Sequence, residues 1–203
     1  MPKLILPTPP GARVRLIAIA KARSFQSGRE FKLASGRIST LYFNMKPTML
    51  DAEGAYLAAA LMLDALADDP ATHVGGLEMG AVPLVAAVAA ISAVRGEPRQ
   101  AVFIRKAAKD HGTQSLIEGL PLGETIAGRT VVVLEDVTTT GGSSLKAVAV
   151  LREAGATVTR VLTLLDRQEG AEAAFAAAGV KLNSILRATD FTGDSNLFPA
   201  ASS

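Results

Sequence analysis

The chain has 203 residues, of which 49% are hydrophobic and only 4% aromatic, a composition that suits one compact domain with a core of small side chains. The absence of cysteine excludes disulfides, thiol nucleophiles and cysteine metal sites. Basic residues outnumber acidic ones by only two and form no stripe, so no nucleic-acid partner is expected. No stretch suits a signal peptide or a membrane span, and we therefore expect a cytoplasmic protein with no membrane contact.

Hydrophobic spacing and turn residues divide the chain into alternating helices and strands. The expected elements, in chain order, are a helix over 12–24, a hairpin over 31–46, a helix from Asp51 as N-cap to about 67, a strand over 74–77, a helix over 82–94, a strand over 101–104, a loop over 105–118, a strand over 131–134, a helix over 144–154 ending at Gly155, a strand over 157–165, a helix over 169–178 ending at Gly179 and a strand over 182–186. This alternation predicts an α/β fold with a mainly parallel central sheet flanked by helices, in a single domain.

The segment 131–144 carries the strongest functional signal. Four apolar residues indicate a buried strand, Glu135 and Asp136 follow it, and a run of small hydroxyl and glycine residues leads to a helix that opens at Ser143 or Ser144. Backbone N–H groups of such a turn, together with a helix N-terminus, favour a bound phosphate, whereas the acidic pair suits ribose hydroxyls or a divalent cation. The segment therefore predicts a ribose-5-phosphate site. The simpler interpretation is an ordinary turn whose hydroxyls cap the next helix.

Two common nucleotide-binding loops do not fit the spacing. The chain contains no G-x-x-x-x-G-K-[ST] sequence, which argues against a P-loop nucleotidase. The segment 75–80 approaches G-x-G-x-x-G but lacks the middle glycine. A sugar-phosphate site therefore remains the better interpretation of segment 131–144.

Three charged residues follow expected strands: Arg105, Asp136 and Arg167. The carboxyl ends of parallel strands meet at one edge of a sheet, where ligands bind. We therefore expect these three residues, far apart in sequence, to face the same edge of the fold. This convergence predicts an active site there.

The expected loop 105–118 gathers Arg105, Lys106, Lys109 and His111. A solvated surface loop is the simple interpretation of such a charge run. The functional interpretation is a lid over an anionic leaving group, because cations stabilise the negative charge that pyrophosphate develops as it leaves an anomeric carbon. His111 is suited to supply a proton or a hydrogen bond near neutral pH. His73 has no acidic or nucleophilic neighbour in sequence and is interpreted as structural.

Four parts of the chain resemble motifs of orotate phosphoribosyltransferases, in that family's order. The segment 131–144 is similar to the phosphoribosyl-pyrophosphate (PRPP) motif of type I phosphoribosyltransferases, and 105–112 with 116–119 is similar to their mobile catalytic loop. The segment 33–37, with 41–44, resembles the Ser-Gly-Arg hood and its aromatic orotate contact. The segment 165–170 resembles the one whose arginine meets the orotate carboxylate. Together the matches run from about residue 31 to residue 170.

The resemblance implies a type I phosphoribosyltransferase fold over residues 1–203, with a small N-terminal hood formed by about 1–48 and the C-terminal tail. It implies transfer of the phosphoribosyl group from PRPP to orotate, giving orotidine 5'-monophosphate and pyrophosphate in pyrimidine biosynthesis, with magnesium carried mainly on substrate oxygens. It also implies a homodimer that shares loop 105–118 between subunits. The implied residues are Lys109, His111, Arg105, Lys106 and Asp136 for catalysis; Glu135, Asp136, Val137, Thr138, Thr139, Thr140, Gly141, Gly142 and Ser143 for PRPP; and Tyr42, Phe43, Thr139 and Arg167 for orotate.

The chain departs from the family pattern at two cationic positions. Ala34 replaces a hood lysine that many members carry, and Met79-Gly80 stands where some carry Tyr-Lys. A cationic contact to phosphate is therefore missing or comes from elsewhere, with Lys32 and Lys46 as candidates. Glu135 replaces the more frequent aspartate and keeps an acceptor for a ribose hydroxyl.

Two alternative functions stay open. One is a phosphoribosyltransferase for another base, against which Arg167 argues because neutral bases have no carboxylate. The other is a non-catalytic regulator that senses the sugar phosphate. Such a regulator would need a nucleic-acid module, for which the residues before the hood are too few.

Overall fold

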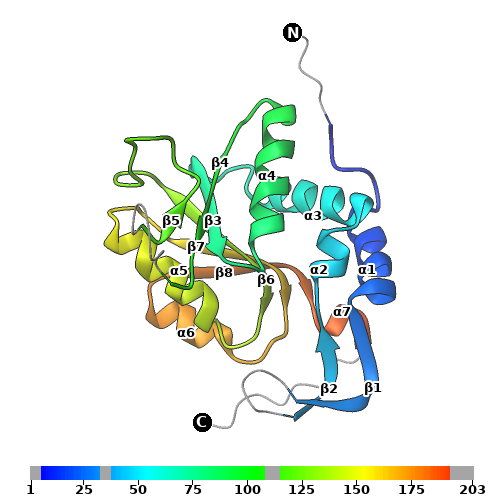
Figure 1. Ribbon diagram of the computed structural model, residues 1–203. Coiled ribbons are helices and arrows are strands. Elements are labelled where there is room, and N and C mark those ends of the chain that lie inside the picture. The colour runs from blue at the N-terminus through cyan, green and yellow to red at the C-terminus, as the bar shows by residue number, and fades with distance from the viewer. Residues whose placement is uncertain (1–5, 33–37, 108–114, 193–203) are drawn as a thin grey trace.

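The computed structural model describes residues 6–32, 38–107 and 115–192 (Figure 1). Its elements, in chain order, are α1 (Ala12–Arg23), β1 (Phe25–Lys32), β2 (Ile38–Phe43), α2 (Lys46–Met49), α3 (Ala52–Ala65), β3 (His73–Leu77), α4 (Val82–Arg95), β4 (Gln100–Ile104), β5 (Ile117–Glu118), β6 (Val131–Thr138), α5 (Gly142–Glu153), β7 (Arg160–Asp166), α6 (Ala171–Ala177), β8 (Lys181–Arg187) and α7 (Thr189–Thr192). The Asp51 carboxylate accepts a hydrogen bond of 2.9 Å from the Gly54 N–H, which confirms the predicted N-cap of α3.

Six strands form the central sheet, in the order β5-β4-β3-β6-β7-β8. Five of them are parallel, and the short β5 pairs with β4 as an antiparallel edge strand. This arrangement confirms the predicted α/β fold. The chain runs outward from β3 to β4 on one side and from β6 to β7 and β8 on the other. In open parallel sheets a ligand crevice forms where the strand order reverses, which here is between β3 and β6.

Helices cover both faces of the sheet, because successive residues of a strand point to opposite faces. In β6, Val132 and Leu134 belong to the core that includes α1, α3 and α4, whereas Val131 and Val133 belong to the core with α5 and α6 (Figure 1). A strand that is buried on both faces has no polar side, which explains the uninterrupted apolar run that predicted it.

A second, two-stranded sheet is formed by the antiparallel hairpin β1–β2. Phe25 and Phe43 of the hairpin pack against each other, with ring centroids 5.0 Å apart. Both also pack against Phe191 of α7, at centroid distances of 5.4 Å for Phe25 and 5.1 Å for Phe43. Aromatic rings bury a large apolar area at such distances, so this cluster fixes the hairpin to the segment that follows β8. The hairpin therefore stands beside the carboxyl end of the central sheet (Figure 1).

Several predicted boundaries were wrong; the strand expected from residue 157, for example, begins at Arg160. The hairpin begins at Phe25 instead of residue 31, because its outer residues are solvent-exposed and polar and give no hydrophobic signal. The motif strand continues to Thr138, where it pairs with Asp166 of β7, so Glu135 and Asp136 lie inside β6 and not after it. The predicted loop 105–118 ends in β5, whose two residues are too few to produce a periodic pattern.

Candidate active site

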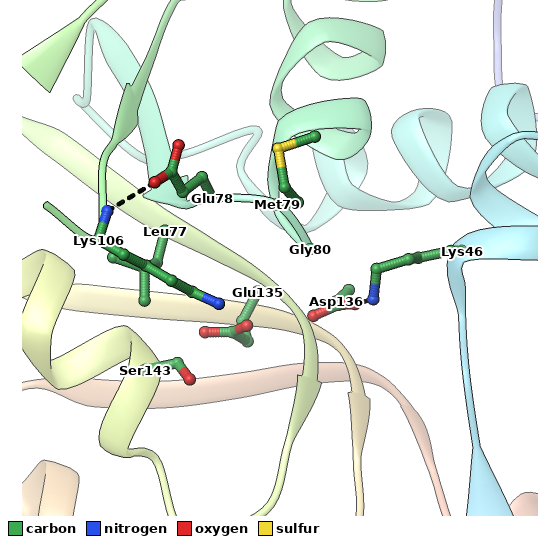
Figure 2. A pocket seen from close by; sticks show the side chains of 9 residues that line it. All are labelled: Lys46, Leu77, Glu78, Met79, Gly80, Lys106, Glu135, Asp136 and Ser143. Atoms are coloured by element: carbon green, nitrogen blue, oxygen red, sulfur yellow. Dashed lines mark hydrogen bonds and ion pairs between the residues drawn. The ribbon is translucent and has the colours of Figure 1, made fainter. Parts of the chain in front are cut away.

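A pocket opens where β3 and β6 separate. The two strands pair only from His73 with Val131 to Gly75 with Val133, whereas β6 stays paired with β7 as far as Thr138. The last part of β6 therefore has a strand on one side only. The pocket occupies the other side (Figure 2) and is lined by Lys46, Leu77, Glu78, Met79, Gly80, Lys106, Glu135, Asp136 and Ser143. It lies at the carboxyl edge of the sheet, where the sequence predicted an active site.

The two carboxylates of β6 have different partners, because neighbouring residues of a strand point to opposite sides. Glu135 is 5% exposed and accepts a hydrogen bond of 2.6 Å from the Ser144 hydroxyl in the first turn of α5. Asp136 is 9% exposed and pairs with the Lys46 ammonium group at 3.7 Å. The pocket thus contains two acceptors for hydroxyl groups, one on each side of the strand end.

The pKa of Glu135 is raised to about 8, mainly by burial and also by the neighbouring Asp136, against the lowering effect of the Ser144 hydrogen bond. At neutral pH these surroundings therefore favour a proton on Glu135. A proton on Glu135 avoids two adjacent buried negative charges.

The segment between β3 and α4 closes the pocket on the β3 side. The Glu78 carboxylate accepts a hydrogen bond of 2.8 Å from the Lys106 backbone N–H, which joins this segment to the residues that follow β4. A methyl group added to Gly80 would lie 2.5 Å from a carboxylate oxygen of Asp136, so only glycine fits there without displacing that side chain. Residues 78–80 therefore form a wall that fits closely against the β6 carboxylates.

The turn from β6 into α5 has the features of an anion site. Gly141 is required for two reasons. Its φ of 85° is one that other residues rarely adopt, and a methyl group there would lie 2.9 Å from the Phe175 ring. Gly141 is also the N-cap of α5, which makes no side-chain capping hydrogen bond. The first N–H groups of this 12-residue helix are consequently left for a bound anion, beside the exposed Ser143.

Arg105 and Lys106 follow β4 but differ in their surroundings. Lys106 lines the pocket, and its ammonium group extends toward Glu135 (Figure 2). The Arg105 guanidinium instead lies 3.8 Å from Glu118 of β5 and donates to the Ala107 carbonyl at 3.2 Å. Arg105 therefore holds together the two ends of the predicted lid. Lys109 and His111 lie outside the described residues.

Arg167 follows β7 and lies between the sheet and the hairpin. It is 4% exposed and pairs with Glu169 at 2.7 Å. It also donates to the Ser39 hydroxyl at 3.1 Å and the Leu41 carbonyl at 3.3 Å, both of β2, and its guanidinium carbon is 5.8 Å from the centre of the Phe43 ring. Arg105, Asp136 and Arg167 thus all lie at the carboxyl edge of parallel strands, but of the three only Asp136 lines the pocket.

The predicted orotate contacts lie on different sides of the hairpin. Tyr42 is half-exposed and stacks on Phe31 with ring centroids 5.3 Å apart, whereas Phe43 points inward to the aromatic cluster and Arg167. Of the predicted PRPP residues, Glu135, Asp136 and Ser143 line the pocket; Val137, Thr138, Thr139, Thr140, Gly141 and Gly142 form the end of β6, the turn and the start of α5.

Sequence reasoning missed Glu78 and gave no firm role to Lys46. Glu78 follows β3 directly, so the rule that selected Arg105 and Arg167 would have selected it too. Lys46 had been one of two candidates for a replacement cation, and it does line the pocket.

Within the described ranges, no three acidic or histidine side chains cluster closely enough to hold a metal ion by themselves. Nor does any helix in those ranges have the length and apolar character to cross a membrane.

Comparisons with known proteins agree with this geometry. The family model of the phosphoribosyl transferase domain matches residues 48–191. The orotate phosphoribosyltransferase of Bradyrhizobium sp. (strain ORS 278) is 56% identical over 180 residues, which cover 89% of this chain and 97% of that protein. The solved orotate phosphoribosyltransferase of Aeropyrum pernix has a TM-score of 0.74 at 34% identity, covering 88% of this chain and 96% of that one. The Mycobacterium tuberculosis H37Rv enzyme in complex with PRPP has a TM-score of 0.73 at 32% identity, covering 89% and 99%.

Proposed function

The chain belongs to the orotate phosphoribosyltransferases, within the phosphoribosyl transferase domain family, and from this membership we propose that the pocket between β3 and β6 is its active site. The protein transfers the 5-phosphoribosyl group of PRPP to orotate, releasing pyrophosphate and giving orotidine 5'-monophosphate for UMP synthesis. The observation that carries the site assignment is the adjacency of a buried carboxylate pair to the N-terminus of a helix without a side-chain cap.

PRPP has three parts, and each finds a chemically matched part of this site. Its 5-phosphate fits the turn 139–143, where the N–H groups at the start of α5 are available. Its ribose hydroxyls fit the acceptors Glu135 and Asp136. Its pyrophosphate then falls between the wall 78–80 and Lys106, which lies on the same side of the pocket. PRPP would thus span the pocket from α5 to β3.

Orotate would bind beside the hairpin, with its carboxylate on Arg167 and its ring near Tyr42, Phe43 and Thr139. The Glu169 carboxylate pairs with one terminal nitrogen of the Arg167 guanidinium at 2.7 Å, the kind of contact that the orotate carboxylate would make. Binding would therefore exchange one carboxylate for another. Neutral bases such as uracil have no group for this exchange, which argues against a phosphoribosyltransferase for another base.

The chemical step breaks the bond between the ribosyl carbon and pyrophosphate, which leaves with the bonding electrons; the orotate nitrogen forms the new bond and gives up its proton to pyrophosphate or solvent. We assign to Lys106, Lys109 and Arg105 the stabilisation of the negative charge on the departing pyrophosphate, and to His111 a proton or hydrogen bond to it. Closure of loop 105–118 would exclude water, which otherwise attacks the electron-deficient ribosyl centre. The Lys106–Glu78 hydrogen bond supports this assignment, since it fixes the start of the loop to the pocket wall.

Magnesium fits the oxygen-rich lining of this pocket. Oxygens of PRPP would carry most of its coordination, and Asp136 and Glu135 line the pocket with further oxygen atoms of the kind that this ion prefers. When bound, the ion offsets the negative charge of the pyrophosphate.

We also propose that residues 1–203 form one domain, that about 1–48 with the C-terminal tail act as a hood over orotate, and that the protein works in the cytoplasm as a homodimer sharing loop 105–118. The packing of the hairpin on α7 supports the hood.

The test is an absorbance assay of orotate consumption with PRPP and magnesium. We expect turnover with orotate, little with uracil, and a severe loss in Asp136→Asn, which keeps the shape of the side chain. Equal turnover of orotate and uracil would contradict the base assignment, and full activity of Asp136→Asn would contradict the site.

A further inference from the structure

We propose that Lys46 binds the pyrophosphate group of PRPP. This inference rests on the proposed function and adds a residue to it. The Lys46 ammonium group lies 3.7 Å from Asp136, and with PRPP bound it would pair with pyrophosphate oxygens instead.

Lys46 occupies an unusual position for a surface lysine. It is the first residue of α2, just after the hairpin, yet it extends to the end of β6, some 90 positions later in the chain. Its side chain remains 50% exposed, and the 3.7 Å separation from Asp136 is longer than a hydrogen bond. The ammonium group therefore keeps hydrogen-bond donors for a ligand. Figure 2 shows Lys46 and Lys106 approaching the two β6 carboxylates from opposite sides.

The charge of the pocket requires such a group. Glu78, Glu135 and Asp136 place carboxyl groups around the space in which a highly charged pyrophosphate would lie. Even with a proton on Glu135, the Glu78 and Asp136 carboxylates would repel this anion, so it binds only where cations offset them. Lys106 supplies one cation on the Glu135 side, and Lys46 supplies the other on the Asp136 side.

The pocket wall leaves little room for a cation from the β3 side. A side chain at Gly80 would displace Asp136, because its first carbon would lie 2.5 Å from the Asp136 carboxylate. A cation next to Asp136 has to come from another element, and α2 provides it. Because Asp136 is the proposed ribose contact and the pyrophosphate is bonded to the same ribose, an ammonium group beside Asp136 lies within reach of that pyrophosphate.

Ribose 5-phosphate and magnesium pyrophosphate probe the two halves of PRPP separately. We would measure the affinity of each by calorimetry for the wild type, Lys46→Met, Lys46→Gln and Lys46→Arg. Lys181→Met serves as the matched control, because this exposed lysine is the first residue of β8 and lies at the amino ends of the parallel strands, away from the pocket. Thermal unfolding of each variant reports its folding.

Lys46→Met and Lys46→Gln should bind pyrophosphate about 10- to 100-fold more weakly, as expected for the loss of a charge-assisted hydrogen bond. Ribose 5-phosphate binding should change less than about threefold, and Lys46→Arg should retain most of the pyrophosphate affinity. In turnover, the KM for PRPP should rise more than kcat falls. Lys181→Met should match the wild type.

Unchanged pyrophosphate affinity in Lys46→Met and Lys46→Gln would overturn the inference. An equal loss of both ligands would also overturn it, because Lys46 would then act only by positioning Asp136. Absence of orotate turnover by the wild type would instead refute the proposed function, while the pyrophosphate titration would still decide the role of Lys46.

Discussion

Glu135 is a carboxylate in surroundings that suit a neutral group. Its pKa is raised to about 8 by burial, whereas the same side chain in the unfolded chain titrates near 4.5. Between these two values the folded state holds one more proton than the unfolded state, so the free energy of unfolding falls as pH rises. The protein should therefore lose stability from about pH 5 to about pH 8.

Glu135→Gln removes this titration and should make the protein more stable than the wild type at alkaline pH. We expect a difference on the order of 2–4 kcal/mol between the two proteins to develop from pH 5 to pH 8.5, visible as a higher midpoint of thermal unfolding followed by circular dichroism. Glu153→Gln, at an exposed position of α5, is the control and should follow the wild-type curve. If the unfolding midpoints of Glu135→Gln and the wild type differed by the same amount at every pH, the pKa of Glu135 would not be raised in the folded protein.

Gly80 is needed for a reason that backbone conformation does not explain. Its added methyl group would meet the Asp136 carboxylate, so Gly80→Ala should displace Asp136 and lower kcat/KM for PRPP about 10- to 100-fold. The effect should nearly vanish in an Asp136→Asn background, because the displaced group has already lost its function. Kinetics of the two single variants and the double variant measure this coupling. Additive losses would place the role of Gly80 elsewhere.

An arginine that is at least half-buried lies at each end of β7: Arg160 is its first residue, and Arg167 follows its last. Arg167, at the carboxyl end, contacts the hairpin and Glu169. Arg160, at the other end, pairs with Asp69 at 3.1 Å and donates to the Ala65 carbonyl at 2.9 Å, which ties β7 to the end of α3.

Arg167→Ala should weaken transition-state binding of orotate by about 2–4 kcal/mol, measured as kcat/KM for orotate. Arg160→Ala should mainly lower the unfolding temperature and leave the KM for orotate near its wild-type value. Arg167→Lys tests whether the positive charge alone is sufficient, since lysine keeps the charge but cannot bind both oxygens of a carboxylate as a guanidinium group does. An orotate KM that rises equally in Arg160→Ala and Arg167→Ala would reduce Arg167 to a structural residue.

The elements that sequence predicted well are those whose signal is local. The apolar run 131–134, the Asp51 cap and the glycines after α5 and α6 are each recognisable within a few residues. The rest of β6 was not recognisable, because two carboxylates normally end a buried strand, and only pairing with β7 extends it to Thr138. The same limit applies to Lys46, whose approach to Asp136 depends on how the hairpin packs on the sheet.

At the scale of the whole molecule, the proposed sharing of loop 105–118 between subunits makes a quantitative prediction. Homodimers of Lys109→Ala and of Asp136→Asn should each be nearly inactive, since every site carries one defect. After the two variants are denatured, mixed and refolded, half of the dimers are mixed, and one site in each mixed dimer has neither defect. About one quarter of all sites should thus recover, measured by orotate consumption. No gain over the separate variants, despite confirmed subunit exchange, would contradict a shared site.

The strand order β5-β4-β3-β6-β7-β8 also determines when this chain is able to fold during its synthesis. The two strands that flank the pocket are neighbours in space, but β6 begins more than 50 residues after β3 ends. When the ribosome has made β3 and β4, the apolar edge of β3 has no partner, because that partner is still to be translated. Long-range parallel pairing of this kind is slow and leaves strand edges exposed in the meantime. The nascent N-terminal half is therefore a predicted client for chaperones, and the arrangement that creates the crevice also delays its completion.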